Sequence, residues 1–287
     1  MRHILALALA IVLAASAAHA QNILFLTKSE GFEHSPVALK DGKTYAGKVI
    51  QELADAHGAS FTETKNGSVI NAENLKNYDL VMFYTSGDLT KPSKDGGDAM
   101  GPNGQAELLE WIKNGAGFMA FHSTTDTFHT PAGGEVTPFV KMLGAEFVSH
   151  GKQFVGTVKV VDTAHPAMAS IPQDWKTNEE WYLFKNFNKE TMHVLALMDP
   201  GEERAKQEVY NIASYPVIWC SQYGNGKVYF SALGHGEEMW DNDSFQQNII
   251  DAATWLLEDG AASVDVKPNY EEVVPKEAAP KEAPKEK

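Results

Sequence analysis

Short apolar runs alternate with amphipathic segments along the first half of the chain, and this alternation limits the folds that the chain can adopt. Each run is bounded by polar residues, which is typical of a strand buried on both faces. The expected strands cover 22–27, 60–64, 78–84 and 117–121, and the expected helices cover 44–57 and 105–114. Strands that alternate with helices predict βαβ units, and their right-handed crossovers give a doubly wound parallel sheet with helices on both faces.

The second half predicts a mixed extension of this sheet. Its apolar runs cover 154–161, 192–197, 215–223 and 227–233. Gly224-Asn225-Gly226 separates the last two runs, and Asn-Gly between apolar runs is a strong hairpin signal. A final helix is expected over 244–258, with Ser244 as its cap. We therefore expect an α/β domain with a mainly parallel sheet and an added antiparallel hairpin.

The first twenty residues resemble a secretory signal peptide. Arg2 and His3 precede an apolar run, and Ala18-His19-Ala20 has the small-x-small pattern that signal peptidase cleaves. The run is shorter than the roughly 20 apolar residues of a comfortable membrane span, and no other stretch is long enough. We expect cleavage after Ala20, a periplasmic or secreted mature protein, and no stable membrane span.

The C-terminal segment differs in composition from the rest of the chain. Residues 263–287 are rich in Pro, Lys, Glu and Ala, and such a composition cannot bury enough surface to offset its ordering entropy. We expect a disordered tail there, and one folded domain over residues 21–262.

Charge and cysteine content exclude two classes of protein. The formal net charge is −14 at pH 7, so the chain would repel phosphate backbones, and no nucleic-acid partner is expected. Cys220 is the only cysteine, so no internal disulfide can form.

Three histidines follow expected strands. His34 comes after the first strand, His122 after the fourth and His235 after the last. Ligands of open parallel sheets bind beyond the carboxyl ends of the strands, so we expect these side chains to border a ligand site. Asp126 follows closely on His122, and Glu180 adds a second carboxylate.

Imidazole and carboxylate groups allow two kinds of chemistry. They are ligands for a divalent transition metal such as Zn²⁺ or Mn²⁺, with His122 and His235 as the expected ligands. No fixed ligand spacing such as His-Glu-x-x-His is present, so the same groups could instead act as general acid and base without a metal. In either case, the expected catalytic residues are His122, His235, Glu180 and Asp126.

Aromatic side chains near Glu180 suit a carbohydrate. Trp181, Tyr182 and Trp240 could stack on a sugar face, although large aromatic residues are more often part of a core. The expected contacts to a small-molecule carbohydrate substrate are His34, Ser123, His129, Trp181 and Tyr182.

Several segments resemble the trehalose-utilisation (ThuA-like) family. They are Gly31-Phe32-Glu33-His34-Ser35, Ala120-Phe121-His122-Ser123-Thr124-Thr125-Asp126-Thr127-Phe128-His129, Glu179-Glu180-Trp181-Tyr182, Tyr215-Pro216-Val217-Ile218-Trp219 and Gly234-His235. They occur in order between about Ile23 and Leu257. The resemblance implies a flavodoxin-like, class I glutamine amidotransferase-like fold, which agrees with the doubly wound sheet.

The amidotransferase comparison also shows what the chain lacks. Those enzymes place a cysteine on a sharp turn from strand to helix, and this sequence has Phe121-His122-Ser123 there, although His235-Gly236-Glu237 resembles their histidine and glutamate. Thiolate chemistry is therefore not expected. Ser123 remains a substitute nucleophile, but it lacks the Gly-x-Ser-x-Gly frame.

The family's role implies disaccharide utilisation alongside dehydrogenases that make 3-keto sugars. A 3-keto group acidifies the neighbouring C–H bond, so a positioned base could eliminate the aglycone or isomerise the sugar. We expect a lyase, hydrolase or isomerase acting on such glycosides. The alternative is a non-catalytic carbohydrate-binding protein on an enzyme-derived fold.

Overall fold

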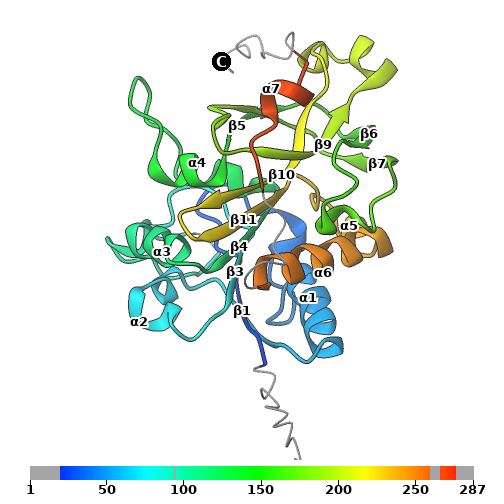
Figure 1. Ribbon diagram of the computed structural model, residues 1–287. Helices are drawn as coiled ribbons and strands as arrows, with labels where there is room; N and C mark the ends of the chain where they lie inside the picture. The colour runs from blue at the N-terminus through cyan, green and yellow to red at the C-terminus, as the bar shows by residue number, and fades with distance from the viewer. Residues whose placement is uncertain (1–19, 94, 259–265, 276–287) are drawn as a thin grey trace, which may run out of the picture.

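A computed structural model of the chain describes residues 20–93, 95–258 and 266–275. Its main feature is a nine-stranded mixed sheet in the order β2-β1-β3-β4-β11-β10-β9-β6-β7, and a separate pair, β5 and β8, lies beside it (Figure 1). The strands of the large sheet are β1 (Asn22–Leu26), β2 (Ser60–Thr64), β3 (Leu80–Phe83), β4 (Gly117–Phe121), β6 (Phe154–Val160), β7 (Asp174–Glu179), β9 (His193–Asp199), β10 (Tyr215–Tyr223) and β11 (Gly226–Ser231). The small pair consists of β5 (Glu146–His150) and β8 (Tyr182–Lys185).

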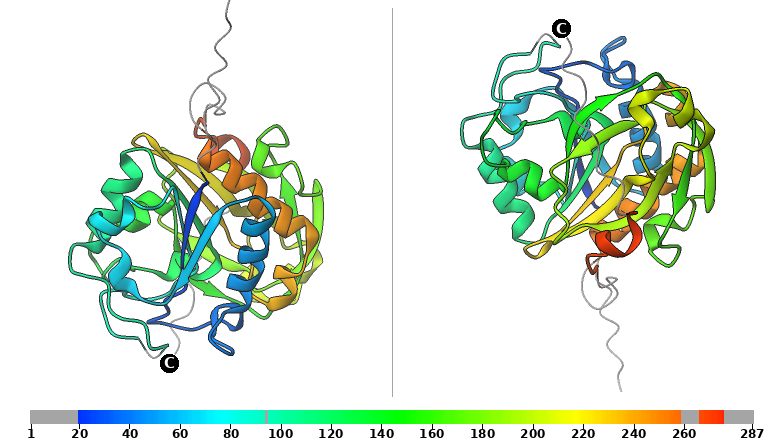
Figure 2. Two further views of the ribbon diagram at one scale, coloured as in Figure 1. Left: turned by 90° about the horizontal axis from the view of Figure 1, so that it is seen from below. Right: turned by 90° about the horizontal axis from the view of Figure 1, so that it is seen from above.

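Most of the α-helices flank the parallel part of the sheet, and the last one packs against β9. The helices are α1 (Tyr45–Ala56), α2 (Ala72–Leu75), α3 (Gly104–Lys113), α4 (Pro138–Leu143), α5 (Glu237–Trp240), α6 (Asp243–Leu257) and α7 (Tyr270–Val273). Seen along the sheet, α1 and α6 lie on one side of β1, and α2 and α3 on the other (Figure 2). Strands covered in this way must be apolar on both faces, and β3 and β4 are buried at every position.

The sheet changes direction at β11. Strands β2, β1, β3, β4 and β11 are parallel neighbours, whereas β10, β9, β6 and β7 each pair antiparallel with the preceding strand. The parallel part has the 2-1-3-4-5 order of the flavodoxin-like fold, whose ligand crevice lies where the order reverses, between β1 and β3. The doubly wound, flavodoxin-like expectation is confirmed. The β10–β11 hairpin lies in the interior of the sheet, because β11 pairs directly with β4.

Three strands, β5, β7 and β8, were not expected from the sequence. Strand β7 alternates buried and exposed residues because only one of its faces meets the core. Strands β5 and β8 pair only with each other, with Phe147 opposite Phe184. Strands β7 and β8 flank the segment Glu180-Trp181 in the sequence.

Part of the expected disordered tail is packed against the domain. Residues 266–275 include α7, where Tyr270 is buried. The side chain of Asn269 bonds to Val194 of β9, and its backbone N–H donates to the carbonyl of Met192 just before that strand. Packing against β9 overrides the composition of this segment. The rest of the expected tail, 263–265 and 276–287, and residues 1–19 of the expected signal peptide lie outside the described residues.

Among the described residues, no helix is both long enough and apolar enough to cross a membrane.

Candidate metal centre

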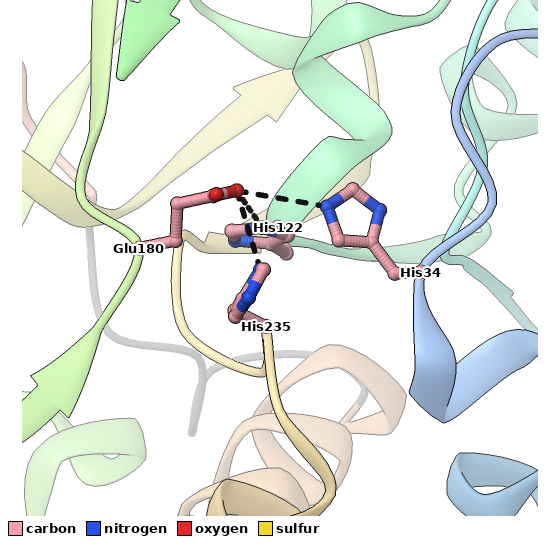
Figure 3. Close-up of side chains that lie close together, drawn as sticks. All are labelled: His34, His122, Glu180 and His235. Carbon is pink, nitrogen blue, oxygen red and sulfur yellow. Dashed lines mark ion pairs between the residues drawn. The ribbon is translucent and has the colours of Figure 1, made fainter. Parts of the chain in front are cut away.

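Four side chains meet beyond the carboxyl ends of the parallel strands. His34 lies in the loop after β1, His122 directly after β4, Glu180 between β7 and β8, and His235 after β11. Their ligand atoms all lie within 4.8 Å of one another. In Figure 3 the three imidazole rings lie on one side of the Glu180 carboxylate, and an ion pair joins each of them to it. The fold thus brings together three histidines and one carboxylate that the sequence singled out separately.

The Glu180 carboxylate is the centre of this cluster. Its Oε2 lies 3.2 Å from His235 Nδ1 and 3.6 Å from His122 Nε2. The same oxygen lies 3.7 Å from His34 Nε2, and Oε1 lies 3.1 Å from His150 Nδ1. Burial opposes ionisation of Glu180, but the imidazoles of His122, His235 and His34 outweigh it and hold the pKa of the carboxyl well below its usual range. The carboxylate is therefore ionised throughout the physiological pH range.

The distances from Glu180 to the three imidazoles are close to those between ligands around one ion. Ligand atoms held at about 2.1 Å from a tetrahedral Zn²⁺ lie about 3.4 Å apart. The three distances from Glu180 Oε2 to the cluster histidines are 3.2, 3.6 and 3.7 Å. An imidazole-rich set with one carboxylate suits Zn²⁺, Mn²⁺ or Fe²⁺ better than Ca²⁺ or Mg²⁺. These four residues therefore fit a divalent transition metal.

His122 is held in the form that a metal ligand requires. Its Nδ1 lies 2.8 Å from the carbonyl oxygen of Ala232, at the end of β11, so this nitrogen carries the proton and donates it. Burial, which is complete, lowers the pKa of His122 to about 3. The imidazole is thus neutral at pH 7, and its Nε2 lies 3.6 Å from Glu180 Oε2. Within the described residues this Nε2 has no hydrogen-bond partner, and such buried orphan atoms are rare unless an ion or water satisfies them.

The other two histidines are held by neighbouring side chains. Burial lowers the pKa of His34, and the Tyr182 hydroxyl lies 3.3 Å from its Nε2. For His235, the interaction with Glu180 outweighs burial and raises the pKa. His235 Nδ1 is buried, and its 3.2 Å contact with Glu180 lacks hydrogen-bond geometry. It is the second orphan atom facing the centre of the cluster.

Glu179 fixes the loop that carries His235. Its Oε1 accepts a hydrogen bond of 2.7 Å from the Gly234 backbone N–H, and its Oε2 accepts one of 3.3 Å from the His235 N–H. Burial raises the pKa of Glu179 to about 7, against these two backbone donors. Tyr84 and Trp240 each donate to the Gly234 carbonyl at 3.0 Å. The loop therefore has little freedom to move away from the cluster.

Asp126 and His129 form a neighbouring charged group outside the four-residue cluster. His129 Nε2 lies 2.5 Å from Asp126 Oδ1, and its Nδ1 lies 3.1 Å from the fully buried Glu146. The hydrogen bond to Asp126 outweighs burial and raises the pKa of His129. His129 also borders a cavity of about 440 Å³ whose polar lining includes Asp88 and Gln105. A second cavity, of about 390 Å³, is lined mainly by apolar side chains of α1 and α6 at the opposite edge of the sheet.

The other expected contact residues lie at different depths. The Ser123 hydroxyl is buried and donates to the Thr85 carbonyl at 3.1 Å. Trp181 is 1 % exposed, and its indole donates to the Phe154 carbonyl. Tyr182 lies against the cluster, with its ring centroid 4.2 Å from that of His122.

Two residues at the site were not selected from the sequence. His150 ends β5, whose pairing with β8 has no local pattern, so only tertiary structure could place its imidazole beside Glu180. Glu179 precedes Glu180 directly, and adjacent residues of an extended segment face opposite ways. This alternation could have predicted that Glu180 faces the cluster and that Glu179 faces the loop that carries His235.

Comparisons with known proteins agree with this fold and cover nearly the whole domain. The model of the family described as ThuA, trehalose utilisation, matches residues 22–256. A ThuA-like protein from Bacteroides uniformis has a solved structure that aligns with a TM-score of 0.67 at 20% identity, over 89% of this chain and 98% of that one. A ThuA-like protein from Parabacteroides merdae aligns with a TM-score of 0.63 at 15% identity, over 92% and 96% of the two chains. No curated protein matches the sequence.

Proposed function

Because the chain belongs to the ThuA family, which is linked to trehalose utilisation, we propose that it is an enzyme acting on a disaccharide or its 3-keto derivative. In this proposal His34, His122, His235 and Glu180 hold a divalent transition metal, Zn²⁺ or Mn²⁺. The observation that carries the proposal is the convergence of three imidazoles and one carboxylate within 4.8 Å at the ligand edge of the sheet.

The cluster would bind and orient the sugar. When bound, a metal ion supplies a Lewis acid for carbonyl and hydroxyl oxygens. Three protein imidazoles are neutral ligands, so Glu180 supplies the single negative charge and leaves the centre with a net positive charge. An ion held by these four residues would attract the electron-rich oxygens of a keto sugar.

The reaction supported best is elimination from a 3-keto glycoside. A base removes the proton on C2, the C1=C2 double bond forms, and the C1–O bond to the aglycone breaks as the departing oxygen takes up a proton. His150 is suited to accept the C2 proton, because it is outside the four-residue cluster, 39% exposed, and 3.1 Å from Glu180. We keep Asp126 and His129 as contacts to the rest of the substrate, along the cavity that His129 borders.

Metal content and turnover test this proposal together. The purified protein is expected to contain about one transition-metal ion per chain and to convert 3-keto-trehalose. The variants His122→Ala and His235→Ala should lose the ion and at least about a hundredfold in turnover, as loss of metal-site residues does. His57→Ala is the matched control, because His57 is an exposed helix-end residue bonded to Leu53. Full activity without metal in His122→Ala would refute the metal assignment.

The alternative, a non-catalytic carbohydrate-binding protein, predicts sugar binding without any product. Trehalose and 3-keto-trehalose would then raise the melting temperature of the metal-loaded protein, while product analysis after long incubation finds the sugars unchanged.

We also propose that the protein acts outside the cytoplasm, because residues 1–20 have the pattern of a secretory signal peptide. N-terminal sequencing of exported protein tests this, with Gln21 as the expected first residue.

A further inference from the structure

Phe32 is the most exposed of the large apolar side chains, at 69% of its surface, among the residues that the structure describes. A single exposed apolar residue on a protein surface needs no explanation. Phe32 differs in its position, because its ring packs edge-on against His34, with the two ring centroids 4.8 Å apart. An aromatic face open to solvent therefore lies directly beside one of the four residues of the cluster.

The loop that carries Phe32 is fixed on both sides. The Ser86 carbonyl accepts hydrogen bonds from the N–H groups of Glu30 and Gly31, and the Ser86 hydroxyl donates to the Phe32 carbonyl at 2.7 Å. On the other side, Glu33 pairs with the buried Lys65 at 2.7 Å. Phe32 is thus an exposed aromatic ring on a backbone with little freedom.

The close packing of Gly31 adds to this rigidity. A Cβ atom at Gly31 would lie 3.2 Å from the Ser86 hydroxyl oxygen and 3.4 Å from Asp126 Oδ2. The loop therefore lies tightly against the ends of β3 and β4. A ring fixed in this way loses little conformational entropy when a ligand covers it, which is the condition for a preorganised binding surface.

We propose that Phe32 is the stacking platform for the pyranose ring of the substrate. A pyranose presents C–H groups on its faces and hydroxyl groups around its rim, so one face can lie on an aromatic ring while rim oxygens reach the metal centre. The platform selects ring sugars over open-chain polyols. This inference rests on the proposed function and names the part of the site that recognises the sugar ring.

The test compares Phe32→Ala and Phe32→Trp with the wild type, all metal-loaded, using 3-keto-trehalose as substrate. Phe32→Ala is expected to raise KM roughly threefold to tenfold, as loss of one aromatic contact does, while kcat and metal content stay unchanged. Phe32→Trp restores the platform and should return KM to near the wild-type value. Leu39→Ala is the matched control, because Leu39 is 51% exposed in the same connection between β1 and α1 and should leave KM unchanged.

Three outcomes would overturn the platform. One is an unchanged KM in Phe32→Ala. The second is loss of metal from Phe32→Ala, which would show that the ring only shields His34. The third is inhibition of the wild type by sorbitol as strong as inhibition by trehalose, since sorbitol has no ring face.

The platform and the proposed function fail in different ways. If the wild type turns over no keto sugar, calorimetric titration with trehalose still tests Phe32, and equal affinities in wild type and Phe32→Ala reject it. If the wild type neither binds nor converts any sugar, the proposed function falls and the platform with it.

Discussion

His122 occupies a backbone conformation that few side chains adopt. Its φ is +39°, in the left-handed region, where a residue with a Cβ atom costs roughly 1–2 kcal/mol. The conformation ends β4 abruptly and turns the imidazole back toward Ala232, which directly follows the neighbouring β11. Strain of this kind persists where surrounding contacts enforce it and is concentrated at functional sites.

His165 allows a prediction at the residue scale, away from the metal centre. It is 1% exposed and lies 3.6 Å from the thiol of Cys220. Burial and nearby His193 lower its pKa to about 4, and Asp162 opposes the shift. The pKa of His165 in the folded chain lies below its unfolded value of 6.5. As the pH falls, the unfolded chain therefore takes up a proton at this residue before the folded chain does. Stability due to this group is therefore complete above about pH 6.5 and is lost as the pH falls toward 4.

Urea unfolding at two pH values measures this effect. Between pH 7 and pH 5 the wild type should lose about 2 kcal/mol through His165. In the wild type, the Ala167 N–H donates a hydrogen bond of 3.2 Å to His165 Nδ1. The variant His165→Asn keeps an acceptor for this N–H, but its side chain cannot titrate. The variant should therefore show a smaller loss, and equal losses in both proteins would contradict the assignment.

At the scale of elements, α7 and the residue before it cover the part of β9 that β6 leaves unpaired. Strand β6 pairs with β9 only from Ala196 to Asp199. Beyond that point, the Asn269 side chain accepts from the Val194 N–H at 2.7 Å and donates to the Val194 carbonyl at 3.0 Å. One amide side chain thus replaces the missing strand neighbour.

Replacing Asn269 should therefore destabilise the whole domain. Asn269→Ala leaves both polar groups of the buried Val194 backbone without these partners, at a cost of about 2 kcal/mol. The free energy of unfolding, measured in urea, gives the value. Glu271→Ala in the same helix is the control, because its ion pair with Lys189 is exposed and should change stability by less than about 0.5 kcal/mol. Similar values for the two variants would show that α7 contributes nothing specific.

The same elements show how far the sequence leads. The β-α alternation predicts β1 to β4, of which β3 and β4 are buried at every position whereas the edge strand β2 is partly exposed along its length. A strand-end rule then selects His34, His122 and His235. Strands β5, β7 and β8 have one buried face or only each other as partners, so their patterns are weak. Glu180 could be proposed as a carboxylate near the site, but its position among three imidazoles depends on those strands.

At the scale of the whole molecule, a bound ion should stabilise the fold. An ion that binds only the folded chain adds RT ln(1 + [L]/Kd), which is about 2.7 kcal/mol at a free concentration one hundred times Kd. Zn²⁺ or Mn²⁺ should raise the melting temperature of the chelator-treated wild type and of His57→Ala. His122→Ala should show a much smaller rise, and an equal rise in His122→Ala would place the stabilising ion elsewhere.

The four residues of the cluster span the chain from His34 to His235, and this spread affects the order of events when the protein matures. No shorter stretch of chain holds the four together, so a partly folded intermediate has at most some of the ligands. An ion can be retained only after β11 has paired with β4 and the segment between β7 and β8 has brought Glu180 beside the three histidines. Metal loading would therefore be the last step of assembly, and the ion acquired would be one that is available in the compartment where folding ends.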